Sequence, residues 1–300
     1  MSNKSKKISI LVIVAIIHIF FAGVFIKNRT TPATMENKIS IATSFYPIHF
    51  LVSEIGGDFV SVDNLTPAGS EPHDYELTAQ DVIKIKKSKL LFLNGGGLEV
   101  WGEKIKKNMN NGSPEVITLG EGLMNEKDPH IWLSPKLMIK MAEKITAELV
   151  EVDLKNKEYY QTNLSTLKSK LASLDGTYVK TLEKCQRRDF ITSHEAFSYL
   201  AEDYNLEQVS IAGISPEEEP SIAQLAQVAN FAKENQIKYI FFESLVSPKL
   251  AETIAKEVGA QTLVLNPIEG LSEEEMAQGK NYLTEMEMNL GNLKIALECK

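Results

Sequence analysis

The sequence predicts an α/β protein with two pseudo-duplicated lobes, each built around a parallel sheet, and one long rigid helix that joins them. The first observation is a strand–helix order that occurs twice, in residues 39–93 and again in residues 189–242. The second is a single apolar stripe through residues 156–184, between the two copies. The third is the composition, because 300 residues with 43% hydrophobic and 24% charged side chains are typical of a soluble globular chain with room for two domains.

The first 36 residues form a separate segment. Lys4, Lys6 and Lys7 precede a nearly uninterrupted apolar stretch, Ile8 to Ile26. As a helix this stretch would be roughly 28 Å long, about the thickness of the hydrocarbon core of a bilayer. The segment contains no cysteine, which excludes lipid attachment at an N-terminal cysteine. We expect an export signal or, preferably, an uncleaved membrane anchor, and therefore an extracytoplasmic protein of the periplasm or cell surface.

The N-terminal lobe is predicted at residues 37–155 and the C-terminal lobe at residues 185–300. In each lobe a strand and an amphipathic stretch lead to a second short strand, a loop with proline and acidic residues, a helix and an apolar strand. Such alternation is typical of parallel sheets, because a crossover helix returns the chain to the start of the next strand. The matched strands are 39–44 and 189–193, 60–62 and 209–211, and 90–93 and 239–242; the matched helices are 78–87 and 221–235; the second amphipathic stretch is 195–204.

Residues 156–184 are predicted to form the linking helix. Apolar side chains recur by threes and fours from Tyr160 to Leu182, which makes one stripe along a helix of about 28 residues, on the order of 40 Å long. A coiled coil is the competing interpretation, but it would need more heptads. We therefore expect a rigid strut, with Asn156 as its N-cap and Gly176 as its one soft point.

Cys185 and Cys299 are the two cysteines of the chain. In an exported protein such a pair more often forms a disulfide than stays reduced, and here it would tie down the last helix. Two unrelated buried thiols are the alternative. Neither cysteine has a CxxC partner or a metal-ligand neighbour, so neither indicates a metal site.

The charge balance argues against one class of partner. Residues 1–36 hold five Lys/Arg and one Glu, so the rest of the chain keeps 27 basic and 39 acidic residues, a net charge of −12. An acidic surface repels nucleic acid and gives metal cations a mildly attractive field. We therefore expect no nucleic-acid partner.

Three histidines lie in one kind of setting. His73, His130 and His194 each lie at a predicted junction between a strand and a helix, where loops of α/β proteins carry function. A fourth junction, after the strand at 262–265, carries Glu269. Because the carboxyl ends of parallel strands meet at one edge of a sheet, two facing lobes would bring these four side chains to one cleft. The helix caps expected after these loops are Thr78 with Asp81, Ser134 before Pro135, and Ser272 with Glu275.

Together these four side chains indicate a metal site. A lone histidine near a helix start is more often a cap or a satisfied polar group. Three histidines in equivalent settings, with a carboxylate in a fourth, reverse that expectation. Three imidazoles and one carboxylate make a complete tetrahedral shell, which suits Zn²⁺, whereas carboxylate-rich sites favour Mn²⁺ or Mg²⁺. Glu243 is the alternative to Glu269 as the fourth ligand, and His49 is expected to be structural.

Acidic residues flank the expected ligands. Asp128 lies two residues before His130 and is expected either to orient that imidazole through its second nitrogen or to serve the Asp-Pro turn. Glu71 and Glu195 are further acidic neighbours of the expected site.

Several sequence motifs occur in the order of one known family. They are Ser-Phe-Tyr-Pro at 44–47, Gly-Ser-Glu-Pro-His-Asp-Tyr-Glu at 69–76, Asp-Pro-His-Ile-Trp-Leu-Ser-Pro at 128–135, Thr-Ser-His-Glu-Ala-Phe at 192–197 and Phe-Glu at 242–243. Through them, residues 38–300 resemble the zinc/manganese group (cluster A-I) of ABC-transporter substrate-binding proteins. The resemblance implies two lobes on one backbone helix with a metal in the interlobe cleft.

The resemblance also implies the site and the partners. His73, His130 and His194 match the three histidine ligands of the family, and Glu269 matches the carboxylate ligand of its zinc-type subgroup. Manganese-preferring members carry a carboxylate where His194 stands, so zinc is the expected ion and manganese the alternative. The implied partners are an ABC permease and its ATPase in the cytoplasmic membrane, and the expected oligomeric state is a monomer.

The sequence departs from the pattern of the family in two respects. Many zinc-binding members carry a histidine-rich loop before the second ligand, but Val116 to Asp128 contains no histidine, and the N-terminal segment lacks the cysteine of lipoprotein members. A surface adhesin, a role proposed for some relatives, is one alternative to a non-enzymatic metal receptor. A zinc hydrolase with Glu269 as general base is the other, although Ala-Phe-Ser after His194-Glu195 rules out an HExxH helix.

Overall fold

The computed structural model describes residues 38–109, 114–125 and 128–300. Residues 39–300 form one compact unit. The expected export signal or anchor, residues 1–36, lies outside the described residues. Within the described ranges every helix is too short or too polar to cross a lipid bilayer.

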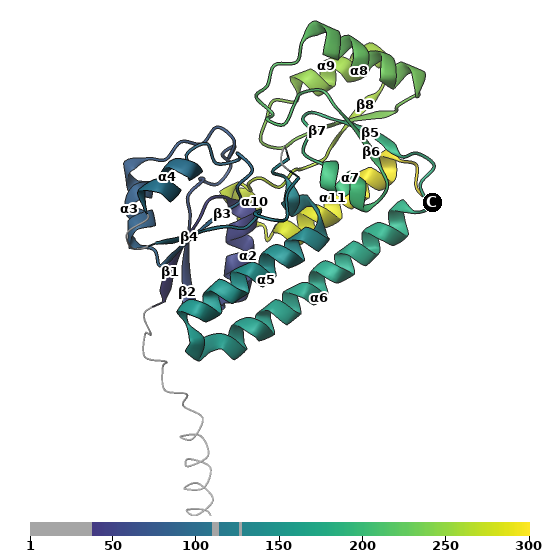
Figure 1. The fold of residues 1–300 in the computed structure, drawn as a ribbon. Helices are drawn as coiled ribbons and strands as arrows, with labels where there is room; N and C mark the ends of the chain where they lie inside the picture. Colours follow the sequence, from purple (N-terminus) through teal and green to yellow (C-terminus); the bar gives the residue numbers. More distant parts are fainter. Residues whose placement is uncertain (1–37, 110–113, 126–127) are drawn as a thin grey trace, which may run out of the picture. The chain divides into compact units, whose positions relative to one another are not determined.

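The first sheet has four parallel strands in the order β2-β1-β3-β4 (Figure 1). Strand β3 lies inside the sheet and is buried along its whole length, as its run of leucine and phenylalanine predicts. The elements are β1 (Ile39–Thr43), α2 (Tyr46–Gly56), the 3-10 turn η1 (Gly57–Phe59), β2 (Val60–Asn64), α3 (Ala79–Lys87), β3 (Leu90–Leu93), α4 (Gly102–Asn108) and β4 (Glu115–Thr118).

The second sheet repeats this topology, because its parallel strands follow the order β6-β5-β7-β8. The duplication predicted from the sequence is therefore confirmed at the level of strand order. The elements are β5 (Asp189–Thr192), α7 (Ser198–Asp203), β6 (Glu207–Ser210), α8 (Ile222–Glu234), β7 (Tyr239–Phe242), α9 (Lys249–Val258) and β8 (Gln261–Val264).

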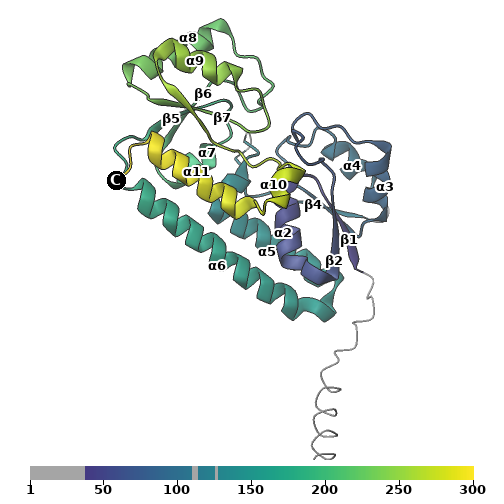
Figure 2. The ribbon, with the colours of Figure 1, turned by 180° about the vertical axis from the view of Figure 1, so that it is seen from behind.

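Long helices pack alongside both sheets. Helix α6 (Lys157–Leu182) has 26 residues and lies against α5 (Pro135–Val152) and α11 (Tyr282–Ala296), as both views show (Figures 1 and 2). One hydrophobic cluster extends from β1 through α6 to β5, so the two sheets share a continuous core. A shared core of this kind opposes large movements of one sheet against the other. The remaining elements are the 3-10 turns η2 (Ile131–Leu133) and η3 (Leu154–Asn156) and the short helix α10 (Glu273–Ala277).

Helix α6 confirms the predicted long helix but corrects its cap. The predicted apolar stripe is buried at Tyr160, and the helix continues without a break through Gly176. Asn156 does not cap the helix through its side chain; its amide instead donates to Asp153 Oδ2 at 2.7 Å. The division into lobes at residues 155 and 185 remains a prediction.

Helix α7 begins later than predicted. The amphipathic stretch was expected to form a helix from Glu195, but residues 193–197 are irregular and the helix starts at Ser198. The carbonyl oxygen of His194 explains the delay, because Thr192 Oγ1 and Gln208 Nε2 both donate to it, at 2.7 and 2.9 Å. This carbonyl is therefore used outside a helical ladder, and His194 lies in a fixed irregular turn.

The prediction from the sequence missed three of the secondary-structure elements, but it included the disulfide. Strand β4 and helices α4 and α9 were not predicted. Strand β4 and helix α4 are short, whereas α9 buries Ala251, Ile254 and Ala255 on one face, a periodic signal that could have found it. The predicted disulfide is present between Cys185, just after α6, and Cys299, just after α11. It ties the end of the long helix to the end of the chain.

Candidate metal centre

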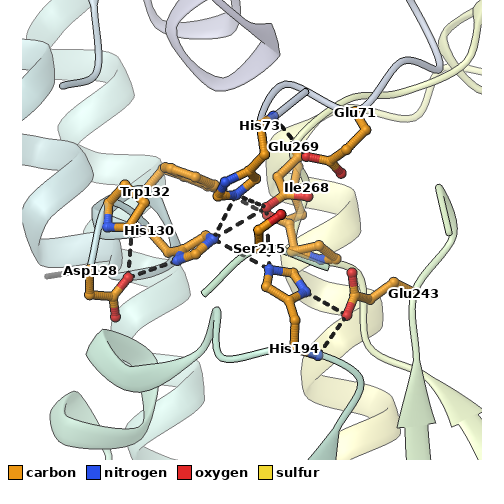
Figure 3. A network of polar contacts seen from close by, with 12 residues as sticks. Glu71, His73, Asp128, His130, Trp132, His194, Ser215, Glu243, Ile268 and Glu269 are labelled. Carbon is orange, nitrogen blue, oxygen red and sulfur yellow. Dashed lines mark hydrogen bonds and ion pairs between the residues drawn. The ribbon is translucent and has the colours of Figure 1, made fainter. Parts of the chain in front are cut away.

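Four buried side chains converge on one point (Figure 3). His73 follows β2, His130 follows β4, His194 follows β5 and Glu269 follows β8, so all four come from the carboxyl ends of parallel strands. One ligand atom from each lies within 4.8 Å of the others. The prediction that these four residues meet is therefore correct, and two come from each sheet.

Helix caps fix the ends of the loops that carry the ligands. The capping box of Thr78 and Asp81 starts α3 after the His73 loop, and the corresponding box of Ser272 with Glu275 starts α10 after Glu269. Ser134 accepts a hydrogen bond from Leu137 N and so caps α5 after His130. Each cap satisfies backbone N–H groups at the helix start, which fixes where the preceding loop must end.

Five of the six distances between the donor atoms match the edges of a tetrahedral shell. His130 Nε2 lies 3.2 Å from His73 Nε2 and 3.3 Å from His194 Nε2. Glu269 Oε1 lies 3.3 Å from Nε2 of His73, 3.3 Å from Nε2 of His130 and 3.5 Å from Nε2 of His194. A tetrahedron with metal–ligand bonds of about 2.0–2.1 Å has edges of about 3.3 Å. Four donors at this spacing can hold an ion of the size of zinc.

Glu269 is a buried carboxylate whose oxygens lack ordinary hydrogen bonds within the described part of the chain. Its side chain is fully buried, and among the described residues neither carboxylate oxygen has a satisfactory hydrogen-bond donor. The Nε2 atoms of the three histidines lie 3.3–3.5 Å from Glu269 Oε1 without forming hydrogen bonds of ordinary geometry to it. A buried carboxylate in this state is costly unless a cation or protonated imidazoles balance it.

Two acidic residues orient the histidines from the opposite side. Asp128 Oδ1 lies 2.7 Å from His130 Nδ1 and accepts from His130 N at 2.9 Å, so the structure favours the orienting role over a simple turn role. Glu243 Oε1 lies 2.7 Å from His194 Nδ1. Glu243 is therefore not part of the four-residue cluster, and its role as an alternative fourth ligand is not supported. Carboxylates in such positions fix the ring orientation and raise ligand basicity.

Neighbouring charges shift the pKa values of His130, His194 and Glu269. Burial lowers the pKa of His194, but Glu243 and Glu269 outweigh it and hold the pKa well above its ordinary value. Burial also lowers the pKa of His130, but Asp128 and Glu269 outweigh it, so that this pKa is raised above its ordinary value. The pKa of Glu269 is well below its ordinary value, because the three imidazoles overcome the effect of burial.

The remaining acidic neighbours differ in their positions. Glu71 Oε1 accepts a hydrogen bond from His73 N at 3.0 Å, and burial together with the charge of Glu269 raises the pKa of Glu71. A protonated Glu71 adds no further negative charge beside Glu269. Glu195 directly follows His194, but it is exposed and is not one of the four clustered residues.

Contacts across the site were not predicted from the sequence. Trp132 Nε1 donates to Pro267 O at 2.7 Å, and Tyr282 Oη donates to Trp132 O at 2.6 Å. Tyr199 Oη donates to Asp128 O at 2.9 Å and accepts from Asn125 N at 2.7 Å. The partners are far apart in the chain, so local patterns carry no signal for them.

The backbone before Glu269 is strained. Ile268 has a φ of 57°, a left-handed conformation that β-branched residues rarely adopt. Its N–H donates to Asn266 Oδ1 at 2.8 Å, and its side chain is fully buried. Surrounding contacts thus hold a costly conformation at the residue that aims the Glu269 carboxylate, as is common at functional sites.

Comparison with known proteins agrees with the motif resemblance. Residues 41–296 match the family model described as zinc-uptake complex component A, periplasmic. The chain is 38% identical over 296 residues to the high-affinity zinc uptake system protein ZnuA of Bacillus subtilis, covering 91% of this chain and 93% of that protein. It is 36% identical over 309 residues to the zinc-binding lipoprotein AdcA of Streptococcus pneumoniae, covering 96% of this chain but only 60% of that longer protein.

Solved structures that are 33–39% identical in sequence to this chain share its fold. The Zn(II)-bound ZnuA-like domain of Streptococcus pneumoniae AdcA has a TM-score of 0.78 and 39% identity, covering 87% of this chain and all of that one. The laminin-binding protein Lmb of Streptococcus agalactiae has a TM-score of 0.80 and 33% identity, covering 86% of this chain and 99% of that one. It is described as a bifunctional protein with adhesin and metal transporting activity. The two-lobe fold is thereby confirmed, and this chain belongs to the family of the periplasmic component A of zinc-uptake complexes, solute-binding proteins rather than enzymes.

Proposed function

We propose that this protein binds one Zn²⁺ ion outside the cytoplasm and delivers it to an ABC permease, whose transport is driven by an ATPase. Nε2 of His73, His130 and His194 and Oε1 of Glu269 would bind the ion. The observation that carries this proposal is the spacing of 3.2–3.5 Å in five of the six donor pairs, close to the edge of about 3.3 Å of a tetrahedral zinc shell. The relatives named as zinc uptake and zinc-binding proteins support it.

The donor set favours zinc over manganese. Three imidazole nitrogens and one carboxylate oxygen at tetrahedral spacing suit a borderline-soft ion that takes four ligands. Manganese prefers more oxygen ligands in octahedral geometry. His194 therefore supports zinc, because a carboxylate in its place would shift the balance toward manganese.

The closed shell favours a carrier over a hydrolase. A catalytic zinc site keeps one position open for water, whereas four protein donors already complete this shell. Glu269 faces the three imidazoles as a ligand, and Asp128 and Glu243 are engaged with histidine nitrogens. This leaves none of these three carboxylates placed to act as a general base on a metal-bound water.

Metal analysis of the chain without residues 1–36 tests this proposal, since residues 39–300 form a compact unit. We expect one tightly held zinc per chain in the wild type and its loss in His194→Ala. The exposed neighbour Glu195→Ala is the matched control and should keep its zinc. A wild-type protein that holds no zinc, or that holds manganese in preference to zinc, would overturn the proposal.

We propose the lobe boundaries, the oligomeric state and the role of residues 1–36 on the same basis. Residues 37–155 and 185–300 would act as two lobes about the helix at 156–184, in a monomeric receptor. Residues 1–36 would export the chain or tether it to the membrane. Size determination in solution tests the monomer, and the mass of the mature protein from a membrane fraction shows whether the segment is retained.

An adhesin role is a second candidate, supported by the description of the Streptococcus agalactiae relative. It would be additional to zinc binding rather than a replacement for it. Binding of the purified zinc-loaded chain to immobilised laminin tests it, with albumin as the control surface. Equal binding to both surfaces would remove this candidate.

A further inference from the structure

A cavity of about 150 Å³ reaches Glu269 from the side of α2. One water molecule occupies about 30 Å³ of liquid, so the cavity has room for about five. Its lining includes Tyr46 and His49 of α2, Asn64 and Thr66 at and after the end of β2, Glu269, and Met276 of α10. The cavity therefore joins a ligand of the candidate metal centre to a histidine that is not one of the four.

Two groups in this lining make no hydrogen bond of ordinary geometry within the described residues. One is the Glu269 carboxylate, fully buried with both oxygens lacking a suitable donor. The other is the His49 imidazole, for which no described residue supplies a hydrogen bond. Burial lowers the pKa of His49, so its ring is neutral at pH 7 and keeps a nitrogen lone pair.

Two other polar side chains of the lining, Asn64 and Thr66, are already engaged. Asn64 Nδ2 donates to Thr66 O at 2.8 Å, and Thr66 Oγ1 donates to Ser44 O at 2.8 Å. Thr43 Oγ1 donates to Asn64 Oδ1 at 3.2 Å. His49 and Glu269 therefore offer a nitrogen and an oxygen ligand in this lining without displacing those hydrogen bonds.

The four-ligand cluster needs an intermediate step for loading. His130, His194 and Glu269 are fully buried and His73 is 9% exposed, so a hydrated ion cannot reach all four donors at once. Removing the whole hydration shell of a divalent ion in one step would be very costly. A carboxylate can share the ion during the transfer, because it has two oxygens while the tetrahedral shell uses one.

We propose that His49 and Glu269 form a staging site, in which Zn²⁺ is held with part of its hydration water between solvent and the four-ligand shell. One imidazole nitrogen and one carboxylate oxygen match the ligand preference of zinc, and the cavity has room for the remaining waters. This inference rests on the proposed function and adds a transient metal site to it.

Stopped-flow measurements of zinc uptake by the metal-free protein, and of zinc release to an excess of chelator, test the proposal. In His49→Phe we expect both rates to fall by about tenfold, since a staging site lowers the barrier in both directions. The dissociation constant should stay within about twofold of the wild type, because His49 is absent from the final shell. Met276→Leu is the matched control, since it alters the same cavity without removing a nitrogen ligand, and its rates should match the wild type.

The possible outcomes separate this inference from the proposed function. A wild type that binds no zinc would overturn both. A wild type that binds zinc, with unchanged rates in His49→Phe, would overturn the staging site alone. A faster release with unchanged uptake would also overturn it, because His49 would then support the final shell. His49→Gln, which keeps a polar side chain, provides a second variant if the phenylalanine substitution disturbs folding, and it should be slow in both directions as well.

Discussion

The indole Nε1 of Trp132 donates a hydrogen bond of 2.7 Å to the carbonyl oxygen of Pro267. Trp132 lies two residues after His130, and Pro267 lies two residues before Glu269, so the bond joins the two loops that carry these ligands. Both partners are buried, and the Tyr282 hydroxyl holds the backbone of Trp132 from another direction. The distance between His130 and Glu269 is therefore fixed by protein contacts before any ion arrives.

Trp132→Phe should loosen zinc binding. The substitution keeps an aromatic ring but leaves the buried Pro267 carbonyl without its donor, which costs about 1–3 kcal/mol. We expect the dissociation constant to rise by about tenfold, mainly through faster release, because the two loops are no longer held in register. Release to a chelator, monitored by stopped flow, measures this effect.

The control for this variant is Trp101→Phe. Trp101 is also largely buried, and it lies just before α4 in a hydrophobic cluster that does not include Trp132. It should lose some stability but keep its rate of zinc release. Equal effects of the two substitutions on release would contradict the role of the Trp132–Pro267 bond.

Asp128→Asn should weaken zinc binding without removing a ligand. The amide keeps the size of the side chain but supplies no charge to His130 Nδ1, so the imidazole becomes a poorer and less oriented donor. Loss of such a partner typically costs about 10–100-fold in metal affinity. Competition titration with a chelator of known affinity measures the change. Asp74→Asn, which is exposed and next to His73, should bind zinc like the wild type; a similar loss there would indicate a general charge effect.

The local features of the fold were predictable because their causes are local. The capping boxes at Thr78 and Ser272 and the long stripe that starts at Tyr160 depend on residues a few positions apart. The meeting of the four ligands was also predictable, because parallel strands place their carboxyl ends at one edge.

Long-range side-chain contacts explain what the sequence did not show. Gln208 reaches from β6 to the carbonyl of His194 and delays the start of α7, against the amphipathic pattern. Glu243 was a reasonable ligand from its position after β7, but its actual partner is the far nitrogen of His194. Which side of an imidazole a carboxylate meets depends on how β5 and β7 pair, and a single sequence does not contain that information.

Removing the disulfide should lower stability but leave the metal centre intact. Cys185 and Cys299 are 114 residues apart in the sequence, and closing a loop of this length stabilises a fold by up to about 4–5 kcal/mol through the entropy of the unfolded chain. We expect a loss of about 3–5 kcal/mol in the free energy of unfolding for the double Cys185→Ser/Cys299→Ser variant. Denaturant titration measures it, and each single substitution should give the same loss. A large fall in zinc affinity would show that the link also shapes the site.

The metal-free protein should lose stability as the pH rises above about 6.5. A histidine whose folded-state pKa is raised contributes stability that is fully present below its unfolded pKa and is lost as the pH rises through the folded value. Despite burial, the neighbouring carboxylates place His130 and His194 in this class. Glu269 has a lowered pKa, so its contribution is present above about pH 4.3 and is lost as the pH falls through the folded value.

Zinc should reverse this alkaline loss, because the ion binds neutral imidazoles and must displace their protons. Thermal unfolding should show a larger stabilisation by zinc at about pH 8 than at about pH 6. Calorimetric titration at pH 7 in two buffers of different ionisation heat should show the release of about one to two protons per zinc. His194→Gln, which removes one of the titrating imidazoles, should show a flatter pH dependence in the metal-free state. If zinc binding released no protons, the raised pKa values of His130 and His194 would be contradicted, because a site that holds neutral imidazoles has no proton to give up.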